Sequence, residues 1–422
     1  MLDVEDLPYL TVDVPGIGGR IKSQPDDFVV DEVPLYEPSG EGTHVYFCIV
    51  KKGMPTMQAV NQIARALGRP VRDIGYAGLK DADAVTSQML SLEHVDPTRI
   101  ESLAIPGIDV REVSRHTNKL KLGHLRGNRF RIKLREVDTL RTGEIRDLLA
   151  KLQQRGAPNY FGPQRFGMRG DTWEAGRALI REDYTEALTV LLGRVGPRDF
   201  GEVRKARELY DQGDYEAASA RWPYPFLGER RLCRAMAKSK GQAGRVFRAI
   251  NPQLRRFYVS AYQSYLFNQV VAERLNSLDC LLYGDLAWRH PQGAVFRVDD
   301  LAVEQPRCDV FEISPTGPLF GQRMTEPTGE PGAIEQKLLA EVDMKPEDWR
   351  AEGRRKIRGG RRPLRVCPHD ASVDSGQDEA GDYIEVQFFL ESGCYATSVL
   401  REICKTAQGF VAGDEATDDL PS

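Results

Sequence analysis

Two hydrophobic periodicities alternate along the chain, and the period of two is clearest between residues 118 and 136 (NKLKLGHLRGNRFRIKLRE). There Phe130, Ile132 and Leu134 alternate with four Lys or Arg residues. Successive side chains of a strand point to opposite faces, so the pattern predicts a strand with one core face and a row of four cations on the other. Asn128 has the parity of the core face. Its inward amide needs partners, either structural or from a ligand.

Three further strands are expected where short runs are rich in β-branched and aromatic residues: 28–30, 44–51 and 383–390. Residues 88–93 also alternate, as a half-buried strand does. The segment before them contains Gly75 and Gly78, which permit tight or left-handed bends, followed by Lys80 and Asp81. A carboxylate on a glycine loop beside a strand is a candidate for chemistry, although most loop aspartates are simply solvated.

A helical period predicts the remaining elements: 56–67 with Thr56 as N-cap and Gly68 as terminator, 139–154 with an apolar face that includes Leu140, 255–275, and 396–405. The 255–275 segment is the longest of these helices. Residues 158–171 (PNYFGPQRFGMRGD) are rich in Gly, Pro and aromatic residues, which indicates a hinge or domain boundary. From there to about Arg362 the pattern is mostly helical.

The composition is that of a globular protein with two or three domains. The chain has 422 residues, of which 41% are hydrophobic and 28% charged. It contains no apolar run long enough to cross a membrane, and its acidic N-terminus does not resemble a signal peptide, so we expect a cytoplasmic protein. The seven cysteines are scattered and form no CxxC pair, and the six histidines show no metal-ligand spacing. A zinc site is therefore not expected.

The charge distribution changes the meaning of the net charge of −4. Residues 115–135 contain eight Lys or Arg and no acid, and residues 354–365 contain seven and no acid. Acids gather near the N-terminus, in 370–382, for which the sequence suggests no role, and in the C-terminal tail, where we expect disorder from Gly409. The basic runs are either solvated faces and a linker or an RNA- or DNA-binding surface.

Local patterns leave other functions open for the Asp81 segment. Asp81 and Asp83 fit a DxD pattern that, in the haloacid-dehalogenase family, marks an aspartyl-phosphate nucleophile with magnesium. The residues before Asp81 are not the strongly apolar strand that such a site requires. An EF-hand is excluded because Thr86 and Leu92 occupy the positions of the loop glycine and the bidentate glutamate. A non-catalytic RNA-binding module is a further alternative.

Five motifs, in order, resemble those of the TruD family of pseudouridine synthases. They cover about Gly19 to Lys405. The motifs are Lys22-x-x-Pro25-x-Asp27-Phe28-x-Val30-x-Glu32, Gly78-x-Lys80-Asp81-x-x-Ala84-x-Thr86-x-Gln88, Gly123-His124-x-x-Gly127-Asn128-x-Phe130, Pro158-Asn159-Tyr160-Phe161-Gly162-x-Gln164-Arg165-Phe166-Gly167, and Ser392-Gly393-Cys394-Tyr395-Ala396-Thr397-x-x-Leu400-Arg401-Glu402.

The resemblance implies an α+β fold: a pseudouridine synthase catalytic domain with a mixed, curved β-sheet, interrupted by a mostly helical insertion domain. The catalytic domain would comprise residues 1–157 and 363–422, the latter with the acidic tail, and the insertion 158–362. The implied activity is isomerisation of a uridine in tRNA, typically at position 13, to pseudouridine. No cofactor or metal is implied. Oligomeric state does not follow from the sequence.

The resemblance also implies roles for particular residues. Asp81 matches the catalytic aspartate, a nucleophile toward C6 of the base or C1′ of the sugar. Phe130 matches the aromatic residue that stacks on the flipped base, as enzymes acting on extruded bases require. The other substrate-binding candidates are Lys22, Phe28, Lys80, Asn128 and Tyr395. Lys22 and Lys80 are the basic residues expected to keep Asp81 ionised.

Overall fold

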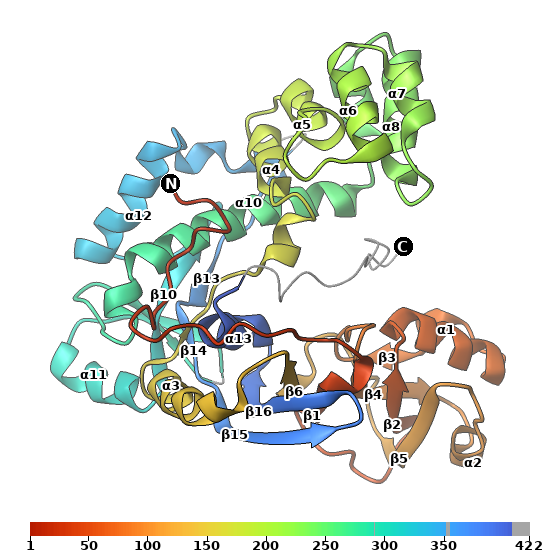
Figure 1. The fold of residues 1–422 in the computed structure, drawn as a ribbon, viewed down its shortest axis with the longest axis vertical. Coiled ribbons are helices and arrows are strands. Elements are labelled where there is room, and N and C mark those ends of the chain that lie inside the picture. Colours follow the sequence, from red (N-terminus) through yellow and green to blue (C-terminus); the bar gives the residue numbers. More distant parts are fainter. Residues whose placement is uncertain (291, 352–354, 407–422) are drawn as a thin grey trace. The chain divides into compact units, whose positions relative to one another are not determined.

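The computed structural model describes residues 1–290, 292–351 and 355–406, which form two compact units (Figure 1). The sheet unit contains Tyr9–Pro158 and the described residues from 366 to 406. The helical unit contains Met1–Pro8 and Asn159–Arg365. The expected disordered tail lies outside the described residues. The chain passes between the units at the short strands β7 (Ala157–Pro158) and β14 (Arg365–Val366).

The sheet unit is built on an eight-stranded mixed sheet in the order β15-β16-β6-β1-β4-β2-β5, with β3 paired to β4 (Figure 1). β1 runs parallel to β4 and antiparallel to β6, and β16 completes the other side of β6. All five expected strands are confirmed. The strands are β1 (Phe28–Pro34), β2 (His44–Lys52), β3 (Gly75–Tyr76), β4 (Val85–Glu93), β5 (Ile108–His116), β6 (Leu125–Arg135), β15 (His369–Asp378) and β16 (Gly381–Glu391).

The strand expected at 88–93 forms as part of β4, but the expectation that it is half-buried was wrong. Every residue from Gln88 to Leu92 is buried. Leu90 and Leu92 belong to one hydrophobic cluster, and Met89 belongs to a second. β4 is hydrogen-bonded to a strand on each side and packed on both faces, so its alternation of side chains does not mark a solvent face.

The expected bends at Gly75 and Gly78 also differ. Neither glycine has a positive φ. Gly75 lies in β3, where a Cβ atom would come within 2.4 Å of the Leu120 carbonyl oxygen. The glycine at this position therefore permits a close approach of two backbones, not a left-handed turn.

The four cations of β6 alternate with the core residues as predicted, but they do not share one environment. Arg129 and Arg131 are exposed, whereas Arg135 is buried. The Arg135 guanidinium contacts Asp27 Oδ1 and Asp378 Oδ1, each at 2.6 Å. Lys133 Nζ lies 2.7 Å from Asp378 Oδ2. Asp378, from the acidic segment with no predicted role, thus neutralises one end of the row.

Four α-helices accompany this sheet: α1 (Thr56–Leu67), α2 (Pro97–Glu101), α3 (Thr142–Arg155) and α13 (Ala396–Cys404). Gly68 closes α1 in the left-handed conformation, with φ of 65°, as predicted. Thr56 is not the N-cap, because Pro55 occupies that position and Thr56 is the first helical residue. Leu140 is exposed in a 3₁₀ turn before α3 and is not part of its apolar face.

The helical unit contains nine α-helices among its described residues and a four-stranded sheet, in the order β13-β10-β8-β9, that the sequence pattern did not reveal (Figure 1). The longest helix is α10, as expected. The elements are α4 (Thr172–Ile180), α5 (Tyr184–Leu192), α6 (Gly201–Asp211), α7 (Tyr215–Arg221), α8 (Leu227–Lys238), α9 (Ala243–Arg248), α10 (Pro252–Glu273), β8 (Leu286–Arg289), β9 (Ala294–Arg297), α11 (Leu301–Asp309), β10 (Ile313–Leu319), α12 (Gly329–Glu341), β11 (Arg350–Ala351), β12 (Arg355–Lys356) and β13 (Gly360–Pro363).

The basic run at 354–365 is not the linker that the sequence suggested. Arg354 lies outside the described residues, and the run continues into β12 and β13. Arg361 is an internal ion-pair partner of Glu335, at 2.8 Å. The Arg362 guanidinium lies 4.4 Å from the Phe161 ring centroid, and Arg365 is fully buried. These three arginines make their contacts within the helical unit, so they are structural cations and not part of a solvated basic surface.

Candidate active site

Asp81 lies in the sheet unit, in the loop between β3 and β4. Its carboxylate Oδ2 accepts a hydrogen bond from Lys22 Nζ at 3.2 Å. The Asp81 side chain is 38% exposed and that of Lys22 is 12% exposed. The pair therefore sits at the surface boundary, where a carboxylate can meet a substrate while its charge is balanced by a lysine.

Lys22 is positioned by an unusual backbone conformation just before β1. Its φ is 54°, in the left-handed region that non-glycine residues seldom adopt. Its ammonium also lies 4.7 Å from the centroid of the Phe28 ring. The aromatic face and the Asp81 carboxylate together orient the Lys22 charge. Strained backbone of this kind is common where a side chain must be aimed at a functional site.

Lys80 does not pair with Asp81, although the sequence offered it as a candidate for that role. Its Nζ contacts Glu32 Oε2 at 2.8 Å and donates to Asn128 Oδ1 at 2.7 Å. The side chains of Lys80 and Glu32 are only 5% and 2% exposed. Glu32 and Asn128 are directly opposite each other on β1 and β6. The oxygen of the inward amide predicted for Asn128 therefore has Lys80 as its partner. Lys80 and Asp81, although adjacent in the loop, contact different groups.

Two residues that sequence reasoning missed hold the backbone of this loop. Lys51 Nζ donates to the Asp81 carbonyl oxygen at 2.9 Å and also to the Met54 carbonyl. The Thr56 hydroxyl accepts from the Lys80 amide at 2.9 Å and donates to Gln88 Oε1 at 2.8 Å. All these contacts are buried or partly buried, so the position of Asp81 is set by groups on β2, α1 and β4.

Lys51 carried a signal in the sequence. It has the parity of Val45, Phe47 and Ile49 on β2, and all four residues are buried. A lysine in a core-facing position of a strand is rare unless the ammonium finds partners. The same pattern did not identify Thr56, because a threonine near a helix N-terminus is ordinary.

The aromatic candidates differ in accessibility. Phe28 and Phe130 meet edge to face with centroids 6.3 Å apart, and Phe130 also contacts Phe388 at 5.5 Å. Phe28 and Phe130 are only 4% and 7% exposed. Tyr395 is 44% exposed at the N-cap of α13. It follows β16, whose last residue, Glu391, pairs with Gly127, one residue from Asn128.

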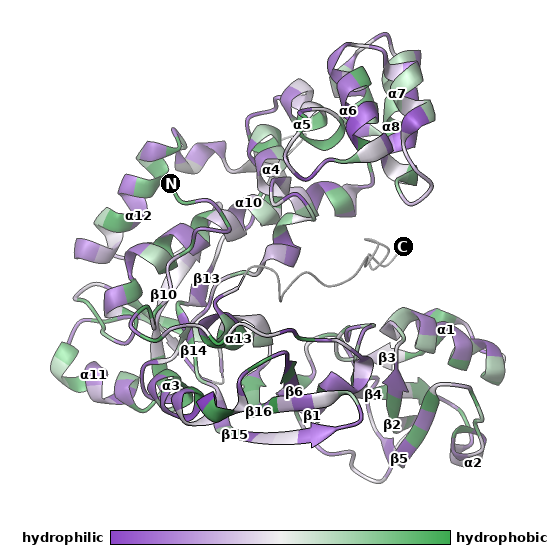
Figure 2. Cartoon of the chain, in the orientation of Figure 1, coloured by the Kyte–Doolittle hydropathy of each residue, from purple (hydrophilic) through white to green (hydrophobic). Residues whose placement is uncertain are grey.

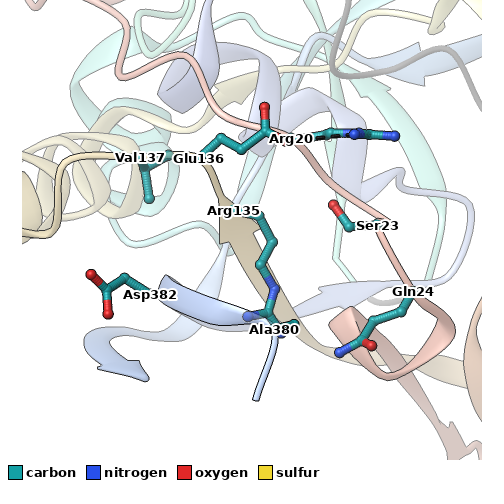
Figure 3. Close-up of a pocket in the computed structure, with 8 residues that line it drawn as sticks. All are labelled: Arg20, Ser23, Gln24, Arg135, Glu136, Val137, Ala380 and Asp382. Atoms are coloured by element: carbon teal, nitrogen blue, oxygen red, sulfur yellow. Dashed lines mark hydrogen bonds and ion pairs between the residues drawn. The ribbon is translucent and has the colours of Figure 1, made fainter. Parts of the chain in front are cut away.

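A pocket of about 570 Å³ lies elsewhere in the sheet unit, and Figure 3 shows its lining. The lining residues are Arg20, Ser23, Gln24, Arg135, Glu136, Val137, Ala380 and Asp382. Its lining contains none of the residues that the sequence singled out, namely Lys22, Phe28, Lys80, Asp81, Asn128, Phe130 and Tyr395. Its buried cation, Arg135, is already engaged by Asp27 and Asp378. We therefore place the candidate site at the Asp81 loop.

Among the described residues, no group of three or more His, Cys, Asp or Glu side chains is arranged to hold a metal ion. No helix in the described part of the chain is both long enough and apolar enough to cross a membrane.

Comparisons with known proteins agree with the motif pattern. The family model for tRNA pseudouridine synthase D (TruD) matches residues 5–403. The chain is 46% identical over 399 residues to the tRNA pseudouridine synthase D of Geobacter metallireducens, covering 94% of this chain and 97% of that one. It is 43% identical over 403 residues to the enzyme of the same name from Geobacter sulfurreducens, covering 96% and 98%.

A solved structure shows the same fold. The crystal structure of a candidate tRNA pseudouridine synthase D (TruD) from Methanosarcina mazei superposes with a TM-score of 0.81 at 28% sequence identity. The match covers 94% of this chain and 96% of the other. This likeness bears out the expected α+β fold. The chain belongs to the tRNA pseudouridine synthase D (TruD) family.

Proposed function

We propose that this protein is a tRNA pseudouridine synthase that isomerises a uridine, at position 13, with Asp81 as the nucleophile. The observation that carries the proposal is the ion pair between Asp81 and Lys22, in which a half-exposed carboxylate is held by a largely buried lysine. Family membership supports the activity, since the relatives named above are tRNA pseudouridine synthases.

The reaction needs a nucleophile, and the loop supplies the Asp81 carboxylate. A carboxylate oxygen of Asp81 forms a bond to the substrate, and the C1′–N1 bond breaks. C1′ is then joined to C5 of the uracil, and the bond to Asp81 breaks, so that the free carboxylate is regenerated. N1 gains a proton and C5 loses one, so the product is an isomer and no co-substrate is consumed. Lys22 would balance the Asp81 charge before attack, and the Lys51 bond to the Asp81 backbone would hold the carboxylate in place.

The target base would be recognised by the aromatic and amide groups around Asp81. Uridine must leave the stack before its glycosidic bond can be reached. Phe130 presents only a small exposed part of its ring, so the base would contact Phe130 at the edge of the core. The more exposed Tyr395 offers a second aromatic surface. The Asn128 amide is oriented by its bond to Lys80 and would contact the uracil edge.

The units correspond to two roles in this proposal. The sheet unit would be the catalytic domain and the helical unit the insertion typical of the family. The helical unit holds residues 159–365, close to the 158–362 expected from the sequence, together with the first eight residues of the chain. The protein would act on tRNA in the cytoplasm.

The test is Asp81→Asn, with Asp83→Asn as its matched control. Asp83 is an exposed acid two residues away in the same loop. We expect Asp81→Asn to bind unmodified tRNA with near-normal affinity but to form no pseudouridine, as read by carbodiimide mapping at each uridine. Asp83→Asn should retain full activity. Normal product from Asp81→Asn would refute the assignment of the nucleophile.

A further inference from the structure

A strongly basic segment of the helical unit lies outside both runs that the sequence analysis singled out. Residues 230–256 contain nine Lys or Arg and no Asp or Glu. They span most of α8, all of α9 and the start of α10. The next acid along the chain is Glu273, at the end of α10. The segment itself therefore supplies no counter-charge to its cations.

Three of these cations form a stripe on α8. Arg231, Arg234 and Lys238 are spaced by three and four residues, which places them on one face of a helix. All three are exposed. The opposite face is anchored in the core by Cys233 and Met236. Figure 2 shows hydrophilic and hydrophobic residues side by side along α6, α7 and α8.

The stripe has no anionic partner in the part of the chain that the structure describes. Neighbouring helices differ, because their exposed cations are paired. Arg204 lies 3.0 Å from Glu208, Lys205 lies 2.8 Å from Glu202, and Arg221 lies 3.3 Å from Glu202. A row of like charges without internal counter-ions creates a positive potential that attracts an external anion.

The single acid of α8, Glu229, does not screen the stripe. Burial raises its pKa, against a smaller opposing effect of the Arg207 charge, and Arg207 is itself buried. Glu229 therefore faces the interior of the helical bundle. Further exposed cations follow α8 along the chain, at Lys240, Arg245 and Arg256.

We propose that the face of α8 that carries Arg231, Arg234 and Lys238 is an RNA-docking surface that binds the phosphate backbone of the tRNA. The proposal rests on the proposed function for the identity of the RNA. Cations spaced about one helical turn apart fit a run of phosphates and require no base contact, so the surface supplies affinity and not sequence choice.

The test compares two triple variants with equal loss of charge. One is Arg231→Gln/Arg234→Gln/Lys238→Gln, and the control is Arg204→Gln/Lys205→Gln/Arg221→Gln, which removes ion-paired cations of the same bundle. The readouts are filter-binding affinity for an unmodified tRNA transcript at several salt concentrations, and the single-turnover rate of pseudouridine formation at saturating tRNA.

We expect the α8 variant to weaken tRNA binding roughly tenfold to a hundredfold at low salt. The negative slope of log affinity against log salt concentration should become shallower by about two to three. Its rate at saturating tRNA should be unchanged. The control should bind nearly as the wild type does. Equal weakening by both variants, or none by the α8 variant, would overturn the proposal.

Failure of the proposed function would look different. A wild-type protein that binds tRNA but forms no pseudouridine would refute the activity and leave the docking surface testable by binding alone. Loss of binding to phosphatidylserine vesicles in the α8 variant, with unchanged tRNA affinity, would assign the stripe to a lipid surface and refute the RNA proposal.

Discussion

Replacing Lys80 by methionine tests the buried ion pair beneath the Asp81 loop. Methionine keeps an unbranched side chain of similar length and removes only the charge and the donors. The Lys80 ammonium contacts Glu32 at 2.8 Å and Asn128 at 2.7 Å. After the substitution the Glu32 carboxylate, 2% exposed, loses its counter-charge. Glu32 keeps one bond, from the Met89 amide at 3.2 Å.

The magnitude follows from this burial. Removing one partner of a buried ion pair leaves an uncompensated charge in a low-dielectric site and costs about 3–5 kcal/mol. Replacing both charges, as in Lys80→Met/Glu32→Gln, removes that charge and leaves only imperfect hydrogen bonding, which costs about 1–3 kcal/mol. We therefore expect the double variant to be more stable than the single variant.

Urea denaturation followed by far-ultraviolet circular dichroism measures these differences. The matched control is Lys52→Met, which breaks the ion pair between Lys52 and Asp26. The side chains of Lys52 and Asp26 are 55% and 52% exposed. An exposed pair of this kind contributes about 0–1 kcal/mol. A Lys80→Met variant no less stable than Lys52→Met, or a double variant less stable than the single one, would show that the Lys80–Glu32 pair is not a buried, mutually dependent unit.

Two further predictions concern groups that stabilise the sheet unit. Thr56→Val removes the hydroxyl that accepts from the Lys80 amide and donates to Gln88, so it should lower the free energy of unfolding by about 1–3 kcal/mol in urea denaturation. Thr56→Ser keeps the hydroxyl and should lose much less stability. Equal losses of stability would contradict the role of the hydroxyl. Hydrogen bonds from Arg135, and to a lesser extent from Lys133, lower the pKa of Asp378. The contribution of this carboxylate to folding stability is therefore present above the unfolded-state pKa of about 4 and is lost as pH falls through the lowered folded-state pKa. The stability difference between wild type and Asp378→Asn should be larger at about pH 7 than at about pH 3, and a pH-independent difference would refute the linkage.

The candidate site shows how far motif resemblance reaches. It identified Lys22, Asp81 and Phe28 as one group, and the structure brings those three into contact. It gave Lys80 as a possible partner of Asp81, and the structure pairs Lys80 with Glu32 instead. Neighbours in sequence on a tight loop point in different directions, so proximity along the chain does not decide which lysine meets which acid.

Local elements were determined by the sequence alone. The alternation in β6 and the helical spacing of α10 and α13 depend on contiguous residues, and those elements form where the pattern places them. The environment of each residue did not follow from the sequence pattern. Arg131 and Arg135 have the same chemistry and parity on β6, yet the first is exposed and the second is buried.

The difference is made by distant segments. Arg135 meets Asp27, 108 residues before it, and Asp378, 243 residues after it. Likewise the Asp81 backbone is held by Lys51, from another strand of the sheet. Periodicity records which side of a strand a residue faces. Whether that side meets water, a counter-charge or a second layer of packing is decided only when the sheet brings separate segments together.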